Sequence, residues 1–297
     1  MTFDYNEILN KINLVDPVKY SRNRNFIDGS VSMLSPYISR GVISTKIVFK
    51  TLINKGFDFM EIEKFIQELC WRDYWQLIWI EKNKLINKDL KRAQEGVVNT
   101  ELSMSINDAK TGIDAIDKSI KDLYENGYMH NHLRMYVASL ACNIAKSHWN
   151  MPAKWMYYYL LDADWGSNAL SWQWVCGSNS NKKYFANQEN INKYCYTNQK
   201  NTFLDTDYSN FNSLDTPNEL LKTVDLKLKT ILPENGSLNL KNELPTLIYN
   251  FYNLDPQWRK NENVNRVLLL EPEIFNSYPI SKKSMDFMLG LSKNIKG

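Results

Sequence analysis

Residues 162–174 read Asp-Ala-Asp-Trp-Gly-Ser-Asn-Ala-Leu-Ser-Trp-Gln-Trp, and this stretch is the most informative one for the fold. Asp162 and Asp164 follow a segment that we expect to end as a helix near Leu161. An Asp-x-Asp pair of this kind either caps the next helix or binds a metal ion. Metal binding is the weaker interpretation, because no third carboxylate and no histidine lies nearby in the sequence. We expect Arg134 to pair with one of the two aspartates.

Apolar residues recur at helical spacing on both sides of this stretch. Capping-box spacing, the combination of Asn and Gly after a periodic run, and an early proline supply start and stop signals. We expect four helices on this basis. The first begins at Asp58, the second covers about 113–125, the third covers about 129–147, and the fourth begins near Pro152.

The composition is that of an ordinary globular protein, with 297 residues, 43% of them apolar and 23% charged. It excludes the collagen-like, low-complexity and disordered classes. The chain has only 11 glycines and 9 prolines, which is few for many short strands, so helix is favoured. Eight of the nine tryptophans lie between Trp71 and Trp174. They predict a large aromatic core and, more weakly, a flat aromatic ligand.

The formal net charge of +3 is too small to indicate nucleic-acid binding by itself. Most of the positive excess lies in residues 1–200, where we expect any anion-binding surface. Four widely spaced cysteines suggest neither a zinc site nor a disulfide framework. The sequence shows no signal peptide and no long apolar segment, so we expect a cytoplasmic protein without membrane contact.

The character of the sequence changes after residue 176. Polar residues without periodicity predict mostly loop over 177–218. Farther on, short buried strands are predicted at 247–251 and 266–271, followed by an amphipathic helix at about 281–295. A strand that leads into a helix indicates a small α/β lobe.

Four motifs, in this order along the chain, resemble the flavin-binding helical domain of DNA photolyases and cryptochromes. They are Ser-Met-Leu-Ser-Pro-Tyr at 32–37, Glu-Leu-Cys-Trp-Arg-Asp-Tyr at 68–74, Met-His-Asn-His-Leu-Arg-Met at 129–135, and the stretch at 162–174. One such motif can match by chance, whereas four in order do not. The resemblance covers roughly residues 20–190.

The expected fold is therefore mainly α. We expect a helical FAD-binding domain of the photolyase and cryptochrome type at residues 1–200, and a loop-rich region with a small α/β lobe at residues 201–297.

The resemblance implies FAD, bound non-covalently in a U-shaped form. Arg134 would pair with Asp162 beside the flavin, and Asn168 would lie opposite the flavin N5. Backbone N–H groups and hydroxyls of the 32–35 loop would hold the phosphates and ribityl chain. The cofactor-binding residues implied are Tyr20, Ser32, Met33, Leu34, Ser35, Arg72, Asn131, Arg134, Asp162, Asp164 and Asn168.

The same resemblance implies DNA as partner, with a pyrimidine dimer flipped out of the duplex and split by an electron from the flavin. Met135 favours cyclobutane dimers, because photolyases for the (6-4) lesion carry histidine there. The DNA-binding residues implied are Arg24, Glu68, Trp71, His132, Met135 and Trp174, and the catalytic set is Trp172, Trp149, Asn168 and Glu68.

Three positions depart from the family pattern. The third tryptophan of the electron relay is replaced by Ile106, so the electron would need another exit, such as Trp155 or a nearby tyrosine. A DNA-contacting arginine is replaced by His132, a weaker phosphate partner. The antenna domain is expected to be absent, and with it an antenna chromophore.

Three functions remain open at this point. The first is a photolyase-like enzyme that repairs cyclobutane dimers, which the residues implied for the dimer pocket favour. The second is a cryptochrome-like blue-light photoreceptor without repair activity, which His132 and the modest charge favour. The third is a flavoprotein without a light function, which Ile106 suggests.

Overall fold

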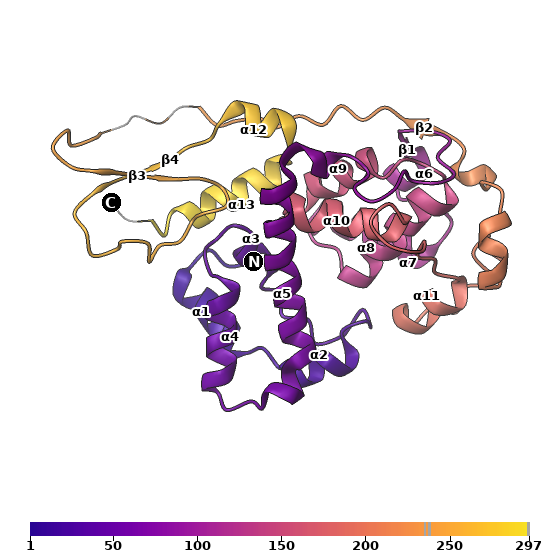
Figure 1. Cartoon of the computed structure of the whole chain (residues 1–297), viewed down its shortest axis with the longest axis horizontal. Coiled ribbons are helices and arrows are strands. Elements are labelled where there is room, and N and C mark those ends of the chain that lie inside the picture. Colours follow the sequence, from indigo (N-terminus) through magenta and orange to yellow (C-terminus); the bar gives the residue numbers. More distant parts are fainter. Residues whose placement is uncertain (235, 237–238, 296–297) are drawn as a thin grey trace.

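The computed structural model describes residues 1–234, 236 and 239–295, and it confirms the expected mainly α fold (Figure 1). Its short strands form two separate two-stranded sheets. The α-helices are α1 Tyr5–Asn13, α2 Pro17–Asn23, α3 Ser35–Ser39, α4 Thr45–Asn54, α5 Phe59–Lys82, α6 Met104–Asn107, α7 Asp114–Asn126, α8 Asn131–Ser139, α9 Asn150–Tyr159, α10 Trp165–Cys176, α11 Gln188–Cys195, α12 Pro272–Ser277 and α13 Lys282–Ser292.

In Figure 1 the 24-residue helix α5 has α1 and α4 on one side and α6–α10 on the other, and α2 packs against α5. Its N-cap is Asp58, whose carboxylate accepts a hydrogen bond from the Met60 N–H at 2.8 Å. The predicted start of this helix is therefore confirmed. Its first turns bury Ile62, Phe65 and Ile66.

The predicted helices over 113–125 and 129–147 are confirmed, with one change. Helix α7 ends at Gly127, which takes the left-handed conformation at φ 67° that favours glycine. The predicted helix over 129–147 is an α-helix only through Ser139, and its continuation Leu140–Ile144 is a π-helix. The wider π turn places Asn143 so that its amide donates to two carbonyls outside the helix, those of Val175 and Tyr184.

Helix α10 packs against α5, α8 and α9, and α9 and α10 together carry much of the aromatic core. Four indoles in this region are at most 2% exposed. They are Trp149, Trp155, Trp165 and Trp172. The predicted aromatic core is thus confirmed, although Trp71 and Trp174 lie outside it.

The prediction of mostly loop over 177–218 is wrong for part of that range. Helix α11 lies within it, and so does a 3-10 helix at Tyr208–Ser213. Asn187 caps α11 by accepting from the Asn190 N–H at 3.0 Å. A polar helix that buries only Gln188, Ile191 and Cys195 has too few apolar positions to show clear periodicity in the sequence.

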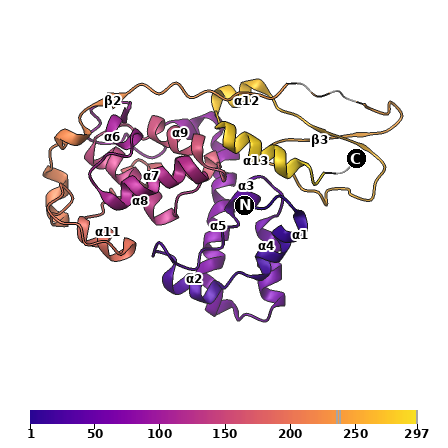
Figure 2. The same ribbon diagram turned by 180° about the vertical axis from the view of Figure 1, so that it is seen from behind.

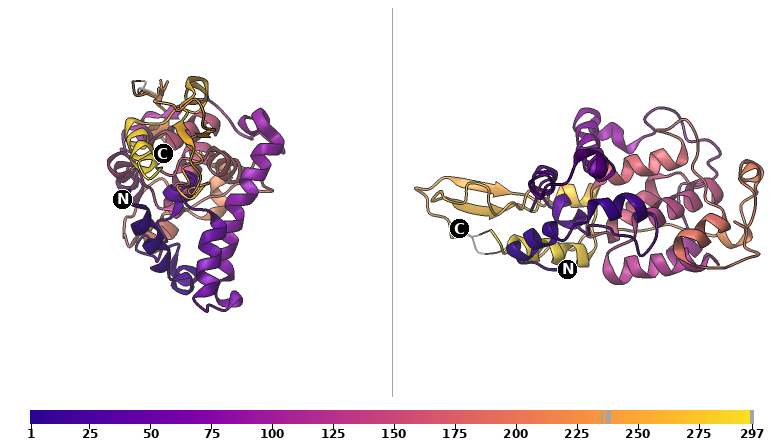
Figure 3. Two further views of the ribbon diagram at one scale, coloured as in Figure 1. Left: turned by 90° about the vertical axis from the view of Figure 1, so that its left-hand side faces the viewer. Right: turned by 90° about the horizontal axis from the view of Figure 1, so that it is seen from below.

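The carboxyl-terminal part contains the expected strands and helix. Strands β3 (Thr246–Tyr249) and β4 (Asn265–Leu268) are parallel, with Leu247 opposite Arg266. Figure 2 shows these strands at the end of the molecule opposite α11, and Figure 3 shows them projecting away from the helices. A second small sheet pairs β1 (Leu102–Ser103) with β2 (Thr223–Val224).

Helix α13 connects this part to the helical core. Phe287 packs against Phe3 and Tyr37 with ring centroids 5.8 and 6.0 Å apart, and α13 contacts α9. Buried side chains from both sides of residue 200 therefore occupy one core cluster. The division of the chain at residue 200 stays a prediction.

Over the residues that the structure describes, no helix combines the length and the apolar character needed to cross a membrane.

Candidate functional site

Asp162 is the centre of the first part of the site. Its carboxylate is buried and lies 3.1 Å, through both oxygens, from Nη2 of Arg134. The Ser35 side chain lies near enough to this carboxylate to help lower its pKa. Burial opposes ionisation, but the fields of Arg134 and Arg72 and the Ser35 hydroxyl outweigh it and hold the pKa of Asp162 below its usual value. The expected pairing of Arg134 with one of the two aspartates is confirmed, and the partner is Asp162.

Asp164 faces a different set of partners. It is the N-cap of α10, where it accepts from the Ser167 N–H at 2.9 Å. It also accepts from Nη1 of Arg72 at 2.8 Å and from the Gln76 amide at 2.7 Å. The capping interpretation is therefore confirmed for this residue. The described residues contain no cluster of three or more histidine, cysteine or acidic side chains suited to a metal ion.

The 32–35 loop lies beside Asp162, because Ser35 contacts that carboxylate. Met33 adopts a positive φ of 53°, and within the described chain the N–H groups of Ser32, Met33 and Ser35 have no protein acceptor. Consecutive N–H groups of this kind form a concave site for an anion. The Ser32 hydroxyl accepts weakly from the Leu34 N–H at 3.4 Å.

This donor set fits a dinucleotide cofactor. Free backbone N–H groups suit phosphates, and the Arg134–Asp162 pair suits the polar edge of a flavin ring. A further observation supports the fit: the Ser167 hydroxyl is buried with no hydrogen-bond partner among the described residues, and it lies in the turn that follows Asp164. An orphaned buried hydroxyl of this kind is expected to bind a ligand or water.

Three further residues predicted to bind the cofactor are Tyr20, Asn131 and Asn168. Tyr20 packs edge-on against Phe65 at 4.9 Å, and burial, followed by the Glu68 charge, raises its pKa. Asn131 is exposed at the first turn of α8. The amide of Asn168 donates to the Ala153 carbonyl at 2.8 Å, which fixes its orientation and leaves its oxygen available.

A cavity of about 360 Å³ lies behind this centre. Of the residues predicted to bind the cofactor, it is lined by Arg72 and Asp164. The rest of its wall comes from residues between Ile38 and Ile47, from Asp73 and Gln76, and from the segment around Tyr252, and of these the sequence motifs did not point to Gln76 or the Tyr252 segment.

The residues predicted to contact DNA include two large exposed indoles. Trp71 on α5 is 48% exposed and stacks on Trp75 at 5.0 Å, and Trp174 on α10 is 41% exposed. Nε of Arg24 lies 3.8 Å from Oε1 of Glu68, so these two predicted residues are brought together.

Met135 is partly buried against the helical core, on the same helix as the Arg134 side chain. The structure therefore gives it an apolar surface that is only partly covered.

His132 is packed edge-on against Tyr136 at 4.7 Å and tilted against Tyr194 at 4.8 Å. Burial, with the fields of His130 and Arg24, lowers the pKa of His132 to about 4. The imidazole is therefore neutral at pH 7, which agrees with its expected weakness as a phosphate partner.

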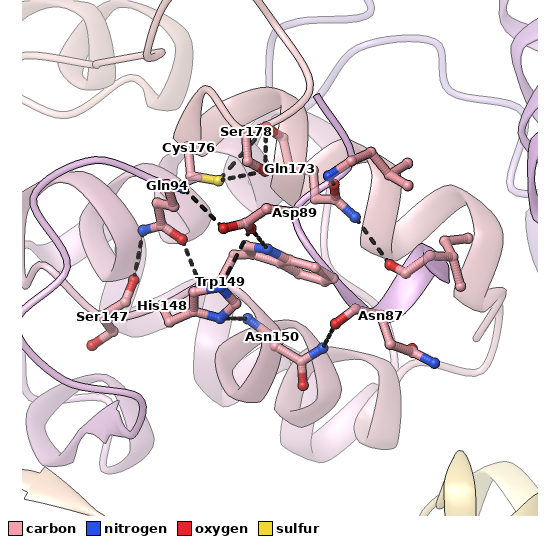
Figure 4. Close-up of polar contacts among 12 residues, drawn as sticks. Asn87, Asp89, Gln94, Ser147, His148, Trp149, Asn150, Gln173, Cys176 and Ser178 are labelled. Carbon is pink, nitrogen blue, oxygen red and sulfur yellow. Dashed lines mark hydrogen bonds and ion pairs between the residues drawn. The ribbon is translucent and has the colours of Figure 1, made fainter. Parts of the chain in front are cut away.

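The predicted relay residues lie in the interior. Trp172 and Trp149 are 2% and 0% exposed, and Ile106 is fully buried in α6. The Trp149 indole N–H donates to the carboxylate of Asp89 at 2.7 Å (Figure 4). Asp89 was missed by sequence reasoning, because it is 60 residues from Trp149 and no motif joins the two.

Comparisons with known proteins agree with this geometry. A family model described as the FAD binding domain of DNA photolyase matches residues 65–208. A deoxyribodipyrimidine photo-lyase of Alkalihalophilus pseudofirmus is 30% identical over 164 residues, which cover 52% of this chain and 33% of that protein. Cryptochrome-1 of Sinapis alba is 26% identical over 187 residues, covering 58% of this chain and 37% of its own.

A solved structure is also similar to this one. A bacterial class III photolyase from Agrobacterium tumefaciens superposes with a TM-score of 0.54 at 25% identity, covering 64% of this chain and 42% of that one. The chain thus spans between 33% and 42% of the length of these proteins.

Proposed function

Residues 65–208 belong to the photolyase and cryptochrome family of FAD-binding domains, and on that premise we propose that this protein uses blue light to drive electron transfer that repairs cyclobutane pyrimidine dimers in DNA. Bound FAD supplies the light absorption and the transferable electron. The protein holds the cofactor and presents the lesion to it.

Arg134 and Asp162 act on the cofactor as a fixed pair. The buried carboxylate holds the guanidinium in place, and Arg134 keeps N–H groups beyond those that contact Asp162 and the Met129 carbonyl. These donors are available to the acceptor edge of a flavin ring. The 32–35 loop contributes N–H groups for the phosphates, and Asn168 contributes an amide oxygen whose direction is set by its bond to α9.

Trp71 and Trp174 supply apolar faces for a flipped pyrimidine dimer, and Glu68 supplies an acceptor for a base edge. Arg24 lies beside Glu68 and offers a cation near the same place. The neutral His132 contributes little to phosphate binding, so affinity for DNA would depend on stacking more than on charge.

The observation that carries this proposal is the exposure of Trp71 and Trp174 on helices that pack against each other. Indoles of this size are costly to leave in water and are frequent at binding surfaces. They favour a stacking ligand, which a sensor without a substrate does not require.

A repair assay tests the proposal. The purified protein is loaded with FAD, reduced, and illuminated with blue light in the presence of an oligonucleotide that carries one cyclobutane dimer. We expect the dimer to be split in the light and not in the dark, and Trp174→Ala to lower the yield. Complete flavin reduction without any splitting would contradict the proposal.

The second candidate is a blue-light photoreceptor without repair activity. It is favoured by His132, whose burial and low pKa remove a cation from the surface proposed for DNA. A photoreceptor predicts a difference between light and dark in the pattern of limited proteolysis or in oligomer size. The absence of any difference, together with dimer splitting, would exclude this alternative in favour of repair.

A further inference from the structure

We propose that Asp89 is the proton acceptor of Trp149, and that this makes Trp149 the residue where the electron path through the protein ends. The inference rests on the proposed function, because it needs a bound flavin that draws an electron from Trp149 by way of Trp172. It explains where the electron path ends, because Ile106 has an aliphatic side chain and cannot be the next electron donor.

The contact between Trp149 and Asp89 is short and direct. The indole Nε1–H of Trp149 donates to Oδ1 of Asp89 at 2.7 Å, and Oδ2 of Asp89 accepts from the Gln94 N–H at 2.9 Å (Figure 4). The Gln94 side chain in turn accepts from the Trp149 backbone N–H at 2.9 Å. These hydrogen bonds fix the carboxylate of Asp89 beside the indole N–H of Trp149.

Asp89 links the buried indole to solvent. Trp149 itself is 0% exposed, whereas the side chain of Asp89 is 20% exposed. Nε2 of His148 lies 3.3 Å from the same Oδ1 atom, and its side chain is 26% exposed. Nδ1 of His148 accepts from the Asn150 N–H at 3.4 Å, which assigns the Nε2–H tautomer and makes His148 a second donor to Asp89. Because the Asp89 side chain is itself partly exposed, a proton on its carboxylate can pass to solvent.

Among the described residues, no carboxylate accepts a hydrogen bond from the indoles of Trp155, Trp165 or Trp172. Trp165, whose ring centroid lies 6.3 Å from that of Trp149, donates to the amide oxygen of Asn87 at 2.8 Å. Trp155 donates to the hydroxyl of Tyr124 at 3.0 Å. An indole that has lost an electron is far more acidic than a neutral indole, and a carboxylate accepts its proton, whereas an amide or a phenol does not. Oxidation is therefore stabilised at Trp149 and not at its neighbours.

The step balances as follows. The Trp149 indole gives one electron, by way of Trp172, to a photoexcited oxidised flavin. Its N–H bond breaks and an O–H bond forms on Asp89, which leaves a neutral indole radical and a neutral carboxylic acid. A soluble thiolate later returns one electron to the radical, and Asp89 returns the proton.

The experiment compares the FAD-loaded wild type with Asp89→Asn. The amide oxygen of the variant still accepts a hydrogen bond but cannot take the proton. Asp286→Asn is the matched control, because it makes the same change on the surface, where Asp286 pairs with Lys282. Laser-flash absorption spectroscopy follows the conversion of the tryptophan radical cation to the neutral radical. Thermal unfolding and the flavin spectrum check that each variant is folded and loaded.

We expect this conversion to be about 100-fold slower in Asp89→Asn, the loss typical of a missing general base, and unchanged in Asp286→Asn. In the dark state, ¹⁵N-tryptophan NMR should show a low-field indole proton that is lost in Trp149→Phe and shifted in Asp89→Asn. This second readout does not depend on light or on activity.

An unchanged conversion rate in a folded, loaded Asp89→Asn protein would overturn the inference, as would an unshifted Trp149 indole signal. Failure of the proposed function is distinguishable from these results. Loss of dimer splitting with a normal Asp89-dependent conversion would remove repair and leave the inference standing. A wild type in which light oxidises no tryptophan would contradict the inference itself.

Discussion

The interior and the outer surface of the helical region use tryptophan in opposite ways. Inside, Trp149 and Trp165 are fully buried and each donates its indole N–H to a polar side chain. Outside, Trp71 and Trp174 are nearly half exposed, and within the described chain their N–H groups have no protein acceptor. The interior indoles are thus satisfied by the protein, and the outer indoles are left for something that the protein binds.

Charged residues show the same difference. The interior carboxylate of Asp162 is fixed by Arg134, whereas Glu68 on the surface has only loose partners, Arg24 at 3.8 Å and Lys64 at 3.9 Å. Buried charges must be paired, while exposed pairs add little to stability. The comparison therefore separates side chains that are fixed by a close buried partner from side chains that are held only loosely.

The largest effect is expected at an interior indole. Trp165→Ala should lower the free energy of unfolding by about 4 kcal/mol, because it leaves a large cavity in a packed core. Trp174→Ala is the matched surface change, for which we expect less than about 1 kcal/mol together with weaker binding of dimer-containing DNA. Urea unfolding measures both, and equal losses would abolish the distinction between the two regions.

The next effect concerns the interior carboxylate. Arg134→Ala should cost about 3 kcal/mol at pH 7, because Asp162 loses its main cationic partner while it remains buried. The native pKa of Asp162 is lowered, so the pair stabilises the protein above the unfolded pKa of about 3.9 and this contribution is lost as the pH falls through the native pKa. The difference between wild type and variant should therefore shrink below pH 4.

Arg72→Ala is the control for that change. Asp164 keeps its bonds from Gln76 and from the Ser167 N–H, so the loss of stability should be smaller than for Arg134→Ala. A larger loss would show that Arg72, and not Arg134, is the main support of the two aspartates.

A smaller effect is expected from His132, which lies between the two regions. Its native pKa of about 4 is below the unfolded value of about 6.5, so the unfolded chain binds the proton more tightly between these values. Stability should therefore rise with pH from about 4 to 6.5, and His132→Gln should flatten part of that slope. Unfolding free energies measured across this range test the prediction, and an unchanged slope would contradict the buried, neutral state of His132.

The smallest change in stability is expected for Glu68→Gln. Its ion pairs are long and partly exposed, so the cost should be under about 1 kcal/mol. Dimer splitting, in contrast, should fall, because the amide cannot accept from a base edge as a carboxylate does. A Glu68→Gln protein that is unstable would show that Glu68 supports the fold. One that is fully active would show that Glu68 takes no part in dimer splitting.

Several features were predictable because their signals are local. The start of α5 at Asp58, the end of α7 at Gly127 and the capping by Asp164 follow from residues within one turn of the helix end. Helix α11 was not predictable in this way, because its polar face outweighs its few buried positions. The π turn after Ser139 depends on carbonyls from other segments, so periodicity alone did not reveal it.

The site was predictable to a different extent. The motifs named Arg134 and the two aspartates as candidate site residues, and the family resemblance already paired Arg134 with Asp162. No motif predicted that Arg72 pairs with Asp164. That pairing follows from the packing of α5 against α10.

The sequence by itself determined that this protein is mainly helical and which residues its motifs share with photolyases and cryptochromes, because these depend on residue type and on spacing along the chain. Only the tertiary structure decided that His132 is neutral and that the Trp149 indole donates to Asp89. Burial and hydrogen bonding between segments 60 residues apart set the charge and the acidity of a side chain, and neither is determined by its neighbours in sequence.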